Sequence, residues 1–295
     1  MKPDTQIVAT VVAYRPDIAL LEQVLAAISP QVASVLLVVN DAGDWACALP
    51  DNVIVDRQKE NVGLGAAYNV AVSWARQQNA SHLLLLDQDS VAASGMVEKL
   101  RVALASDPQA AAAGPLWQDR RNGHDGFFVR LGRFRTHKYM PQKGETINVD
   151  FLISSGSLIP LDALSAIGDF DAGLFIEHVD TEWSLRARAR GYRLLGVAAA
   201  RLGHTIGEKV LNSSVLTGRR AFFYYPPERQ YYLLRNSLIL WRRPYAPWSW
   251  VLHDMRRTFL LMSYYALFLP PRLLRLRAMI RAIRDGSRAR SCAAE

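Results

Sequence analysis

Residues 82–89 read His-Leu-Leu-Leu-Leu-Asp-Gln-Asp, four leucines that end abruptly in two carboxylates. A short apolar run of this kind predicts a buried strand. Alternate residues of an extended chain point the same way, so Asp87 and Asp89 can face one site. Carboxylate oxygens suit Mg²⁺ or Mn²⁺. The alternative is that the two acids only cap the next helix. This stretch therefore predicts a buried strand that ends in a candidate metal site.

The segments before this strand alternate between short apolar runs and helical spacing. Residues 7–13, 35–39 and 53–55 are predicted strands, and residues 18–28 and 66–77 are predicted helices. This alternation predicts an α/β fold, a Rossmann-like, mainly parallel sheet with helices on both faces. In such sheets ligands bind beyond the carboxyl ends of the strands. The residues at these ends are Tyr14, Asn40, Asp41, Asn61, Asp87, Gln88 and Asp89.

The middle of the chain is less periodic. Residues 117–144 are rich in Gly, Arg and His and predict a long loop,. Order returns at 151–160. A helix is predicted to start near Thr181 and to end at Gly191, with a strand at 194–197.

Composition bounds the class of protein. The chain has 295 residues, half of them hydrophobic, with 35 Lys and Arg against 27 Asp and Glu, a net charge of +8. The excess gathers in 272–290, an arginine-rich stretch whose single acid is Asp285. Two distant cysteines, Cys47 and Cys292, predict a reducing compartment without a disulfide framework,. No run reaches about 18 apolar residues, so neither a membrane-spanning helix nor a secretory signal is predicted.

A glycine segment, Asn-Val-Gly-Leu-Gly-Ala-Ala-Tyr-Asn, occupies residues 61–69. Gly63 and Gly65 permit close backbone approach to a ligand at a helix start. Tyr68 stands where the dinucleotide fingerprint requires its third glycine. The flanking Asn61 and Asn69 suit hydrogen bonds to a base or ribose. The alternative is packing of the helix through small residues.

Residues 175–183 read Phe-Ile-Glu-His-Val-Asp-Thr-Glu-Trp at the predicted helix start. Asp180 or Glu182 is a candidate general base toward an acceptor hydroxyl. A helix N-terminus favours the ionised form of a carboxylate, although Asp180 is otherwise explained as an N-cap. His204 follows a predicted strand and is a candidate third metal ligand, with a structural or surface role as the alternative.

Two arginines lie in a Tyr-rich helical stretch, Arg-Gln-Tyr-Tyr-Leu-Leu-Arg-Asn at 229–236. Arginine binds phosphate through two parallel hydrogen bonds, so Arg229 or Arg235 is a candidate partner of a departing diphosphate. The alternative is that both are solvated or interhelical arginines.

These segments, in this order, resemble glycosyltransferase family 2 with its GT-A fold, and most of all the bacterial L-rhamnosyltransferases that use dTDP-L-rhamnose. The resemblance runs from about residue 7 to residue 236. The strings that carry it are NVGLGAAYN, LLLLDQDS, FLISSGSLI, GDFDAGLFIEHVDTEWSLRARARGY and RQYYLLRN.

The resemblance implies roles for individual residues. Asp87 and Asp89 correspond to the family's Asp-x-Asp metal motif, joined by His204 in some members. Asp180 corresponds to the catalytic base, and Mg²⁺ or Mn²⁺ to the cofactor. Further nucleotide-sugar contacts are expected at Tyr14, Asn40, Asp41, Asn61, Gly63, Gly65, Asn69, Asp87 and Gln88. Acceptor or diphosphate contacts are expected at Ser155, Gly156, His178, Trp183, Arg229 and Arg235.

The chain departs from the family pattern at two positions. Val179 stands before Asp180 where the family has Glu, so Glu182 supplies the second acid and the identity of the base stays open between Asp180 and Glu182. Asn40 replaces the first acid of the pair after the second strand, which makes Asp41 the favoured contact to the nucleotide base.

The expected organisation is a GT-A catalytic domain at 1–225, with a nucleotide-sugar half at about 1–115 and an acceptor half at about 145–225. A helical, basic and aromatic region follows at 226–295. Within it, residues 272–284 predict a basic amphipathic helix, which is typical of a membrane-surface element. An oligomer interface or packing on the catalytic domain is the alternative. Its apolar positions are Leu273, Leu274, Leu276, Met279, Ile280 and Ile283.

The resemblance implies an inverting enzyme that moves L-rhamnose to a hydroxyl of a glycan or glycolipid, in synthesis of cell-surface polysaccharide, lipopolysaccharide O-antigen or rhamnolipid. It would be cytoplasmic and peripheral at the inner face of the bacterial membrane. The alternatives are another nucleotide sugar or an inactive membrane-bound scaffold. A nucleotidyltransferase is disfavoured because no Gly-rich loop follows the first strand. Nucleic acid is not an expected partner, since the basic residues form no recognised motif.

Overall fold

The chain forms two compact units in a computed structural model that describes residues 6–43, 45–120, 123–132, 136–204, 210–213 and 220–289. The first unit comprises residues 1–130, 137–175 and 179–205. The second comprises 131–136, 176–178 and 206–295. The expected domain boundary near 225 lies within the second unit and stays a prediction.

The first unit is built on one mixed sheet that is parallel over most of its width. Its described strands lie in the order β3-β2-β1-β4-β10-β6-β11-β5, and β9 pairs with β11. Neighbours among β1 to β4 are parallel, as are β6 and β11, whereas β10 is antiparallel to β4 and β6. The bounds are β1 Ile7–Ala13, β2 Ser34–Val39, β3 Val53–Arg57, β4 His82–Asp87, β5 Val91–Ala92, β6 Ala110–Asp119, β9 Thr146–Val149, β10 Leu158–Pro160 and β11 Arg193–His204.

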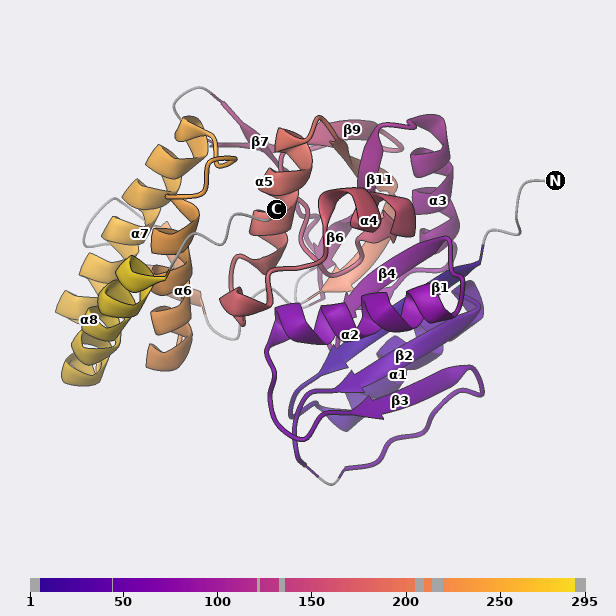
Figure 1. The fold of residues 1–295 in the computed structure, drawn as a ribbon, viewed down its shortest axis with the longest axis horizontal. Coiled ribbons are helices and arrows are strands. Elements are labelled where there is room, and N and C mark those ends of the chain that lie inside the picture. Colours follow the sequence, from indigo (N-terminus) through magenta and orange to yellow (C-terminus); the bar gives the residue numbers. More distant parts are fainter. Residues whose placement is uncertain are drawn as a thin grey trace. The chain divides into compact units, whose positions relative to one another are not determined.

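Helices cover both faces of this sheet, with α2 in front of the strands and α1 behind them in Figure 1. Helix α1 begins after Asp17, whose carboxylate accepts a hydrogen bond from Leu20 N,. Its apolar positions turn inward as the spacing predicts. The bounds are α1 Ile18–Ile28, α2 Leu64–Gln77, α3 Met96–Ser106, α4 Leu161–Ile167 and α5 Val179–Ala189, with short 3-10 turns at Ser29–Gln31 and Ala172–Leu174.

The strand of four leucines lies at the centre of the core. Leu83 to Leu86 are essentially inaccessible to solvent, so both faces of β4 are covered,. The strand ends at Asp87, which pairs in register with Val12 near the end of β1. The core therefore delivers Asp87 to the carboxyl edge of the parallel strands, as the sequence predicts.

The region 117–144 is more ordered than predicted. Strand β6 extends to Asp119, and β7 (Phe128–Leu131) pairs with β8 (Thr136–Tyr139) in a two-stranded sheet. The prediction of a single long loop is wrong, because these strands are short and half-exposed and carry little alternation of apolar and polar residues,.

The helix that carries Asp180 starts slightly earlier than predicted. Helix α5 begins at Val179, two residues before Thr181, and ends at Ala189. Gly191 follows with a φ of +85°, where its N–H donates to Arg188 O. The predicted glycine at the helix end is confirmed, because this backbone conformation favours glycine.

The described part of the second unit holds a hairpin and three longer helices, which Figure 1 shows packed side by side. Their core contains Leu233, Leu261, Tyr265, Met279 and Ala282. Within the described residues, no helix has the length and apolar character needed to cross a membrane. The bounds are β12 Val210–Ser213, β13 Arg220–Phe223, α6 Pro227–Leu240, α7 Trp248–Phe268 and α8 Arg272–Arg288.

Candidate active site

Three potential metal ligands meet at the carboxyl edge of the sheet. Asp87 ends β4, Asp89 follows two residues later, and His204 ends β11. One ligand atom from each lies within 4.8 Å of the others. The closest His204 nitrogen, Nδ1, is 3.6 Å from Asp89 Oδ1. The structure thus brings His204 to two carboxylates that lie more than a hundred positions earlier in the chain.

The pairing of β5 with β11 explains how His204 reaches this place. Gly203 pairs with Val91 in antiparallel register, so His204 lies beside Ser90. The Ser90 hydroxyl is fully buried and lies 2.7 Å from His204 Nδ1, which fixes the orientation of the ring. Ser90 follows directly after Asp89 in the Asp-Gln-Asp-Ser stretch, a position that the sequence analysis did not select.

The pKa of the Asp87 carboxylate is strongly shifted by its surroundings. Burial and the charges of Asp89 and Asp180 raise its pKa, His204 and the Tyr68 hydrogen bond oppose them, and the net pKa is about 6,. The Tyr68 hydroxyl donates to Asp87 Oδ1 at 3.3 Å. Burial also raises the pKa of Tyr68 well above its usual value, so this hydroxyl remains a donor.

This donor set fits a hard divalent cation. Two carboxylates and one imidazole supply oxygen and nitrogen ligands of the kind that Mg²⁺ and Mn²⁺ accept,. Clustered carboxylates also repel one another, and a cation would relieve that repulsion. Asp87, Asp89 and His204 therefore fit the divalent cation that the Asp-Gln-Asp motif implies.

Asp180 lies in the first turn of α5, close enough to Asp87 and Tyr68 for its charge to act on both. Its Oδ1 accepts a hydrogen bond from Thr181 N at 2.7 Å. It also lines a narrow cavity together with Ser154 and Trp183. Asp180 therefore belongs to the same electrostatic cluster as the three candidate metal ligands.

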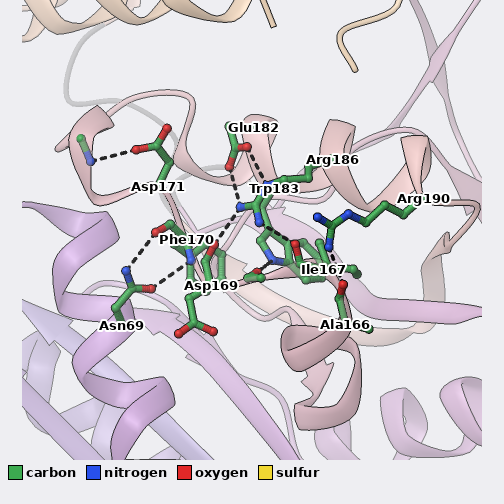
Figure 2. Close-up of polar contacts among 12 residues, drawn as sticks. Asn69, Ala166, Ile167, Asp169, Phe170, Asp171, Glu182, Trp183, Arg186 and Arg190 are labelled. Carbon is green, nitrogen blue, oxygen red and sulfur yellow. Dashed lines mark hydrogen bonds and ion pairs between the residues drawn. The ribbon is translucent and has the colours of Figure 1, made fainter. Parts of the chain in front are cut away.

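Glu182 has a different environment from Asp180. It is 1% exposed, and both of its carboxylate oxygens accept hydrogen bonds from Arg186, at 2.8 and 2.9 Å. Arg186 also donates to Ile167 O at 2.8 Å and to Asp169 O at 2.7 Å (Figure 2). Trp183 Nε1 donates to the neighbouring Gly168 O at 3.0 Å. Glu182 and Trp183 thus hold the loop that follows α4.

The glycine segment packs against the protein chain itself, and its expected contact with a nucleotide sugar stays a prediction. A side chain on Gly63 would overlap Phe175, and one on Gly65 would meet Asp171 O at 2.9 Å. Asn69 exchanges two hydrogen bonds with the main chain of Phe170, each at 2.9 Å (Figure 2). Glycine is required at positions 63 and 65 because the 170–175 loop packs directly against their main chain. This arrangement agrees with the alternative that the segment packs through small residues.

The residues after β2 form a hydrogen-bonded turn. Asn40 Nδ2 donates to Asn61 Oδ1 at 3.1 Å, and Asn40 Oδ1 accepts from Val62 N at 2.9 Å. Asp41 accepts from Gly43 N, at 2.7 Å, and from Trp45 Nε1, at 3.2 Å. These bonds, together with one from the Arg15 main chain, outweigh the opposing effect of burial and lower the pKa of Asp41,.

The edge residues Tyr14 and Gln88 are joined, because Tyr14 N donates to Gln88 Oε1 at 2.6 Å. Ser155 supports the end of β4 through a bond from Asp87 N to its Oγ at 3.0 Å. Gly156, with a φ of +86°, donates from its N–H to Leu85 O at 2.7 Å. Ser155 and Gly156 are therefore braces of the metal-bearing strand in this structure.

The remaining candidates belong to the second unit. His178 Nε2 lies 3.0 Å from Ser237 Oγ, and Arg229 is ion-paired with Glu177. Arg235 stacks on the ring of Tyr232, with 5.4 Å from its guanidinium carbon to the ring centre. These contacts give His178, Arg229 and Arg235 defined roles inside that unit, and their proposed part in acceptor or diphosphate binding stays a prediction.

Comparison with known proteins gives a consistent picture. Residues 37–168 match the family described as glycosyl transferase family 2. The dTDP-rhamnosyl transferase RfbF of Shigella flexneri is 24% identical over 255 residues, which cover 83% of this chain and 82% of that protein.

Two solved structures share the fold at low identity. GalNAc-T7, determined with UDP, GalNAc and Mn²⁺, has a TM-score of 0.57 at 14% identity and aligns with 97% of this chain. TarS of S. aureus has a TM-score of 0.54 at 15% identity and aligns with 95%. The chain spans 57% and 48% of these two larger proteins, and the likeness establishes a GT-A fold. The family match over residues 37–168, the relative over most of the chain and the shared fold all relate the chain to glycosyltransferase family 2.

Proposed function

We propose that this glycosyltransferase is an inverting, metal-dependent rhamnosyltransferase that moves L-rhamnose from dTDP-L-rhamnose to a hydroxyl of a glycan or lipid-linked acceptor. The observation that carries the proposal is the cluster of Asp87, Asp89 and His204 within 4.8 Å, beside a fourth ionisable group, Asp180. The name of the relative RfbF supports the choice of donor.

The chemistry divides between the two parts of this cluster. A divalent cation held by Asp87, Asp89 and His204 would neutralise the diphosphate that leaves with the nucleotide. Asp180 accepts the proton of the acceptor hydroxyl as its oxygen attacks the anomeric carbon. The bond from that carbon to the diphosphate breaks in the same step, so a single displacement inverts the configuration.

Asp180 is favoured over Glu182 as the base. Glu182 is buried, and both of its oxygens are bound by Arg186, which leaves it no room to accept a proton from substrate. Asp180 is partly accessible and lies within the field of the candidate metal ligands.

Calorimetric titration with dTDP-rhamnose, UDP-glucose and GDP-mannose, in Mn²⁺ and in EDTA, tests the donor and the metal together. The expected result is binding of dTDP-rhamnose alone, and only with Mn²⁺. Binding of another nucleotide sugar would retain the family chemistry and reject the rhamnosyl assignment. Absence of all binding would favour an inactive scaffold.

We also propose that the second unit binds a membrane surface, where a lipid-linked acceptor would lie. On α8 the exposed Leu273, Leu276, Ile280 and Ile283 recur every three or four residues and form one stripe,. Ile280 is 68% exposed. The adjacent stripe is basic and consists of Arg277, Arg281, Arg284 and Arg288.

An apolar stripe beside a basic stripe matches a helix that lies in the interface of an anionic bilayer. Helix α7 carries a second exposed stripe, Trp248, Leu252, Met255 and Phe259. One residue of the apolar face predicted for α8 is not on the exposed stripe, because Met279 packs in the core of the second unit. No acidic residue of α8 lies in either exposed stripe.

Sedimentation with vesicles tests the membrane proposal. The protein is expected to pellet with vesicles containing phosphatidylglycerol, less so at high salt, and to stay in solution with neutral phosphatidylcholine. Ile280→Glu should release it. Val102→Glu, which alters a 53% exposed apolar residue of α3, is the matched control. A wild-type protein that ignores anionic vesicles would contradict the proposal without affecting the donor assignment.

A further inference from the structure

The ring of Tyr68 is buried beneath the candidate metal site. Tyr68 lies on α2 and has no solvent-exposed surface. Its ring packs against Phe170, with 5.2 Å between the ring centres. The next residue, Asn69, holds the main chain of Phe170 by two hydrogen bonds. The ring is therefore enclosed, and Phe170 of the loop that Asn69 holds packs against it.

The hydroxyl of this confined ring reaches the first metal-motif carboxylate. It donates to Asp87 Oδ1 at 3.3 Å and is also hydrogen-bonded to the side chain of Ser154. The main chain of Asp87 is held separately, by the bond from its N–H to Ser155 Oγ. Asp87 is thus fixed at two points, one on its backbone and one on its carboxylate.

Such a contact has a clear purpose in a cluster of like charges. Asp89 and Asp180 both act on Asp87, and their repulsion favours rotation of its side chain away from the site,. A hydrogen bond to one carboxylate oxygen opposes that rotation. Partners of this kind orient the residues that ligate a metal and tune their affinity.

We propose that Tyr68 is a positioning residue of the cation site, whose hydroxyl holds the Asp87 carboxylate in the orientation that receives a divalent ion. The glycine segment then has two roles. Tyr68 orients a ligand of the cation site, and Gly63, Gly65 and Asn69 hold the 170–175 loop. This inference rests on the proposed function, because it assumes that a cation binds Asp87, Asp89 and His204.

Titration of the metal-free, full-length protein with Mn²⁺ tests the inference by calorimetry, without any turnover. Tyr68→Phe keeps the ring and its contact with Phe170 and removes only the hydroxyl. Its dissociation constant for Mn²⁺ is expected to rise about 10-fold. The melting temperature of the metal-free variant should stay close to that of the wild type, since the buried ring is retained.

Tyr139→Phe is the matched control. Tyr139 also donates its hydroxyl to a carboxylate, Glu145 Oε1, at 2.8 Å, and Glu145 is not among the candidate metal ligands. This variant should bind Mn²⁺ as the wild type does. Unchanged Mn²⁺ affinity in Tyr68→Phe, or a loss accompanied by an equal loss in Tyr139→Phe, would overturn the inference. A wild type that binds no Mn²⁺ would instead overturn the metal site itself, and the inference with it.

Discussion

At the scale of single residues, the clearest distinction is between Asp180 and Glu182. Side chains that are two positions apart on a helix point to nearly opposite sides, so Asp180 and Glu182 cannot share one environment. Asp180 joins the cluster of Asp87 and Tyr68, whereas Glu182 turns toward Arg186 and the loop after α4. The two acids that the sequence left undecided therefore have different surroundings.

Asp180→Asn is expected to retain donor binding and to lose transfer. The amide is isosteric but cannot take the acceptor proton, so the rate should fall by about 10²- to 10⁴-fold. Calorimetry with donor and Mn²⁺, followed by product quantification, measures both properties on one preparation. Near-normal turnover in this variant would remove Asp180 from the role of base.

At the scale of elements, α5 organises the loop that links it to α4. Arg186 bonds to Glu182 and to the carbonyls of Ile167 and Asp169, and Figure 2 shows these bonds converging on one guanidinium. The same loop continues into Phe170 and Asp171, which contact α2. The buried ion pair of Arg186 and Glu182 therefore holds the loop that connects α4 to α5.

Arg186→Met should destabilise the protein by about 3–5 kcal/mol, because it leaves the buried Glu182 carboxylate without its partner. Arg76→Met is the comparison, since the Arg76–Asp169 pair is about one-third exposed and should contribute less than about 1 kcal/mol,. Urea unfolding of both variants at pH 7 measures the difference. Equal losses would mean that the buried pair has no special role.

Gly63→Ala is expected to disturb the contact between α2 and the 170–175 loop. An added methyl group would meet Phe175 atoms at 2.6–2.9 Å, and the φ of Gly63 is +84°. Gly144 shares the left-handed backbone, with a φ of +82°, but nothing lies within 4 Å of such a methyl group. The fall in melting temperature should therefore be clearly larger for Gly63→Ala than for Gly144→Ala. A similar fall in both would assign the effect to backbone strain alone.

At the scale of the whole molecule, each unit has its own buried polar centre. In the second unit this centre is Asp254, which accepts hydrogen bonds from Trp241 Nε1 at 2.9 Å and from Arg257 at 2.8 Å. Burial opposes ionisation of Asp254, but the charges of His178 and Arg257 outweigh it and lower its pKa to about 2,.

This shift predicts acid sensitivity of the second unit. Because the folded pKa lies below the ordinary value of 3.8, the stabilisation is present above about pH 4 and is lost as the pH falls toward 2,. Asp254→Asn should lose roughly 2 kcal/mol at pH 7 and show a flatter dependence on acid pH. Asp51→Asn, at an exposed position of the first unit, is the control. Urea titrations between pH 2 and 7 would contradict the assignment if both variants behaved alike.

Much of the first unit could be predicted from the sequence. The predicted bounds of β1 and α1 agree with the structure, and the strand ending in Asp87 lies where the four leucines placed it. These elements have strong local signals, namely continuous apolar runs or helical spacing. The short strands β7 and β8 were missed because they are half-exposed and lack such a signal.

Three features could be predicted from the amino-acid sequence alone: the α/β class, the order of strands and helices around Asp87, and the residue types available for a metal site. These features follow from local periodicity and from the chemistry of adjacent side chains. Three further contacts became visible in the folded chain: His204 lies beside Asp89, Arg186 binds Glu182, and the glycine segment packs against the 170–175 loop. Each of these contacts depends on which sheet edge or loop a distant segment reaches, and periodicity along the chain contains no information about that.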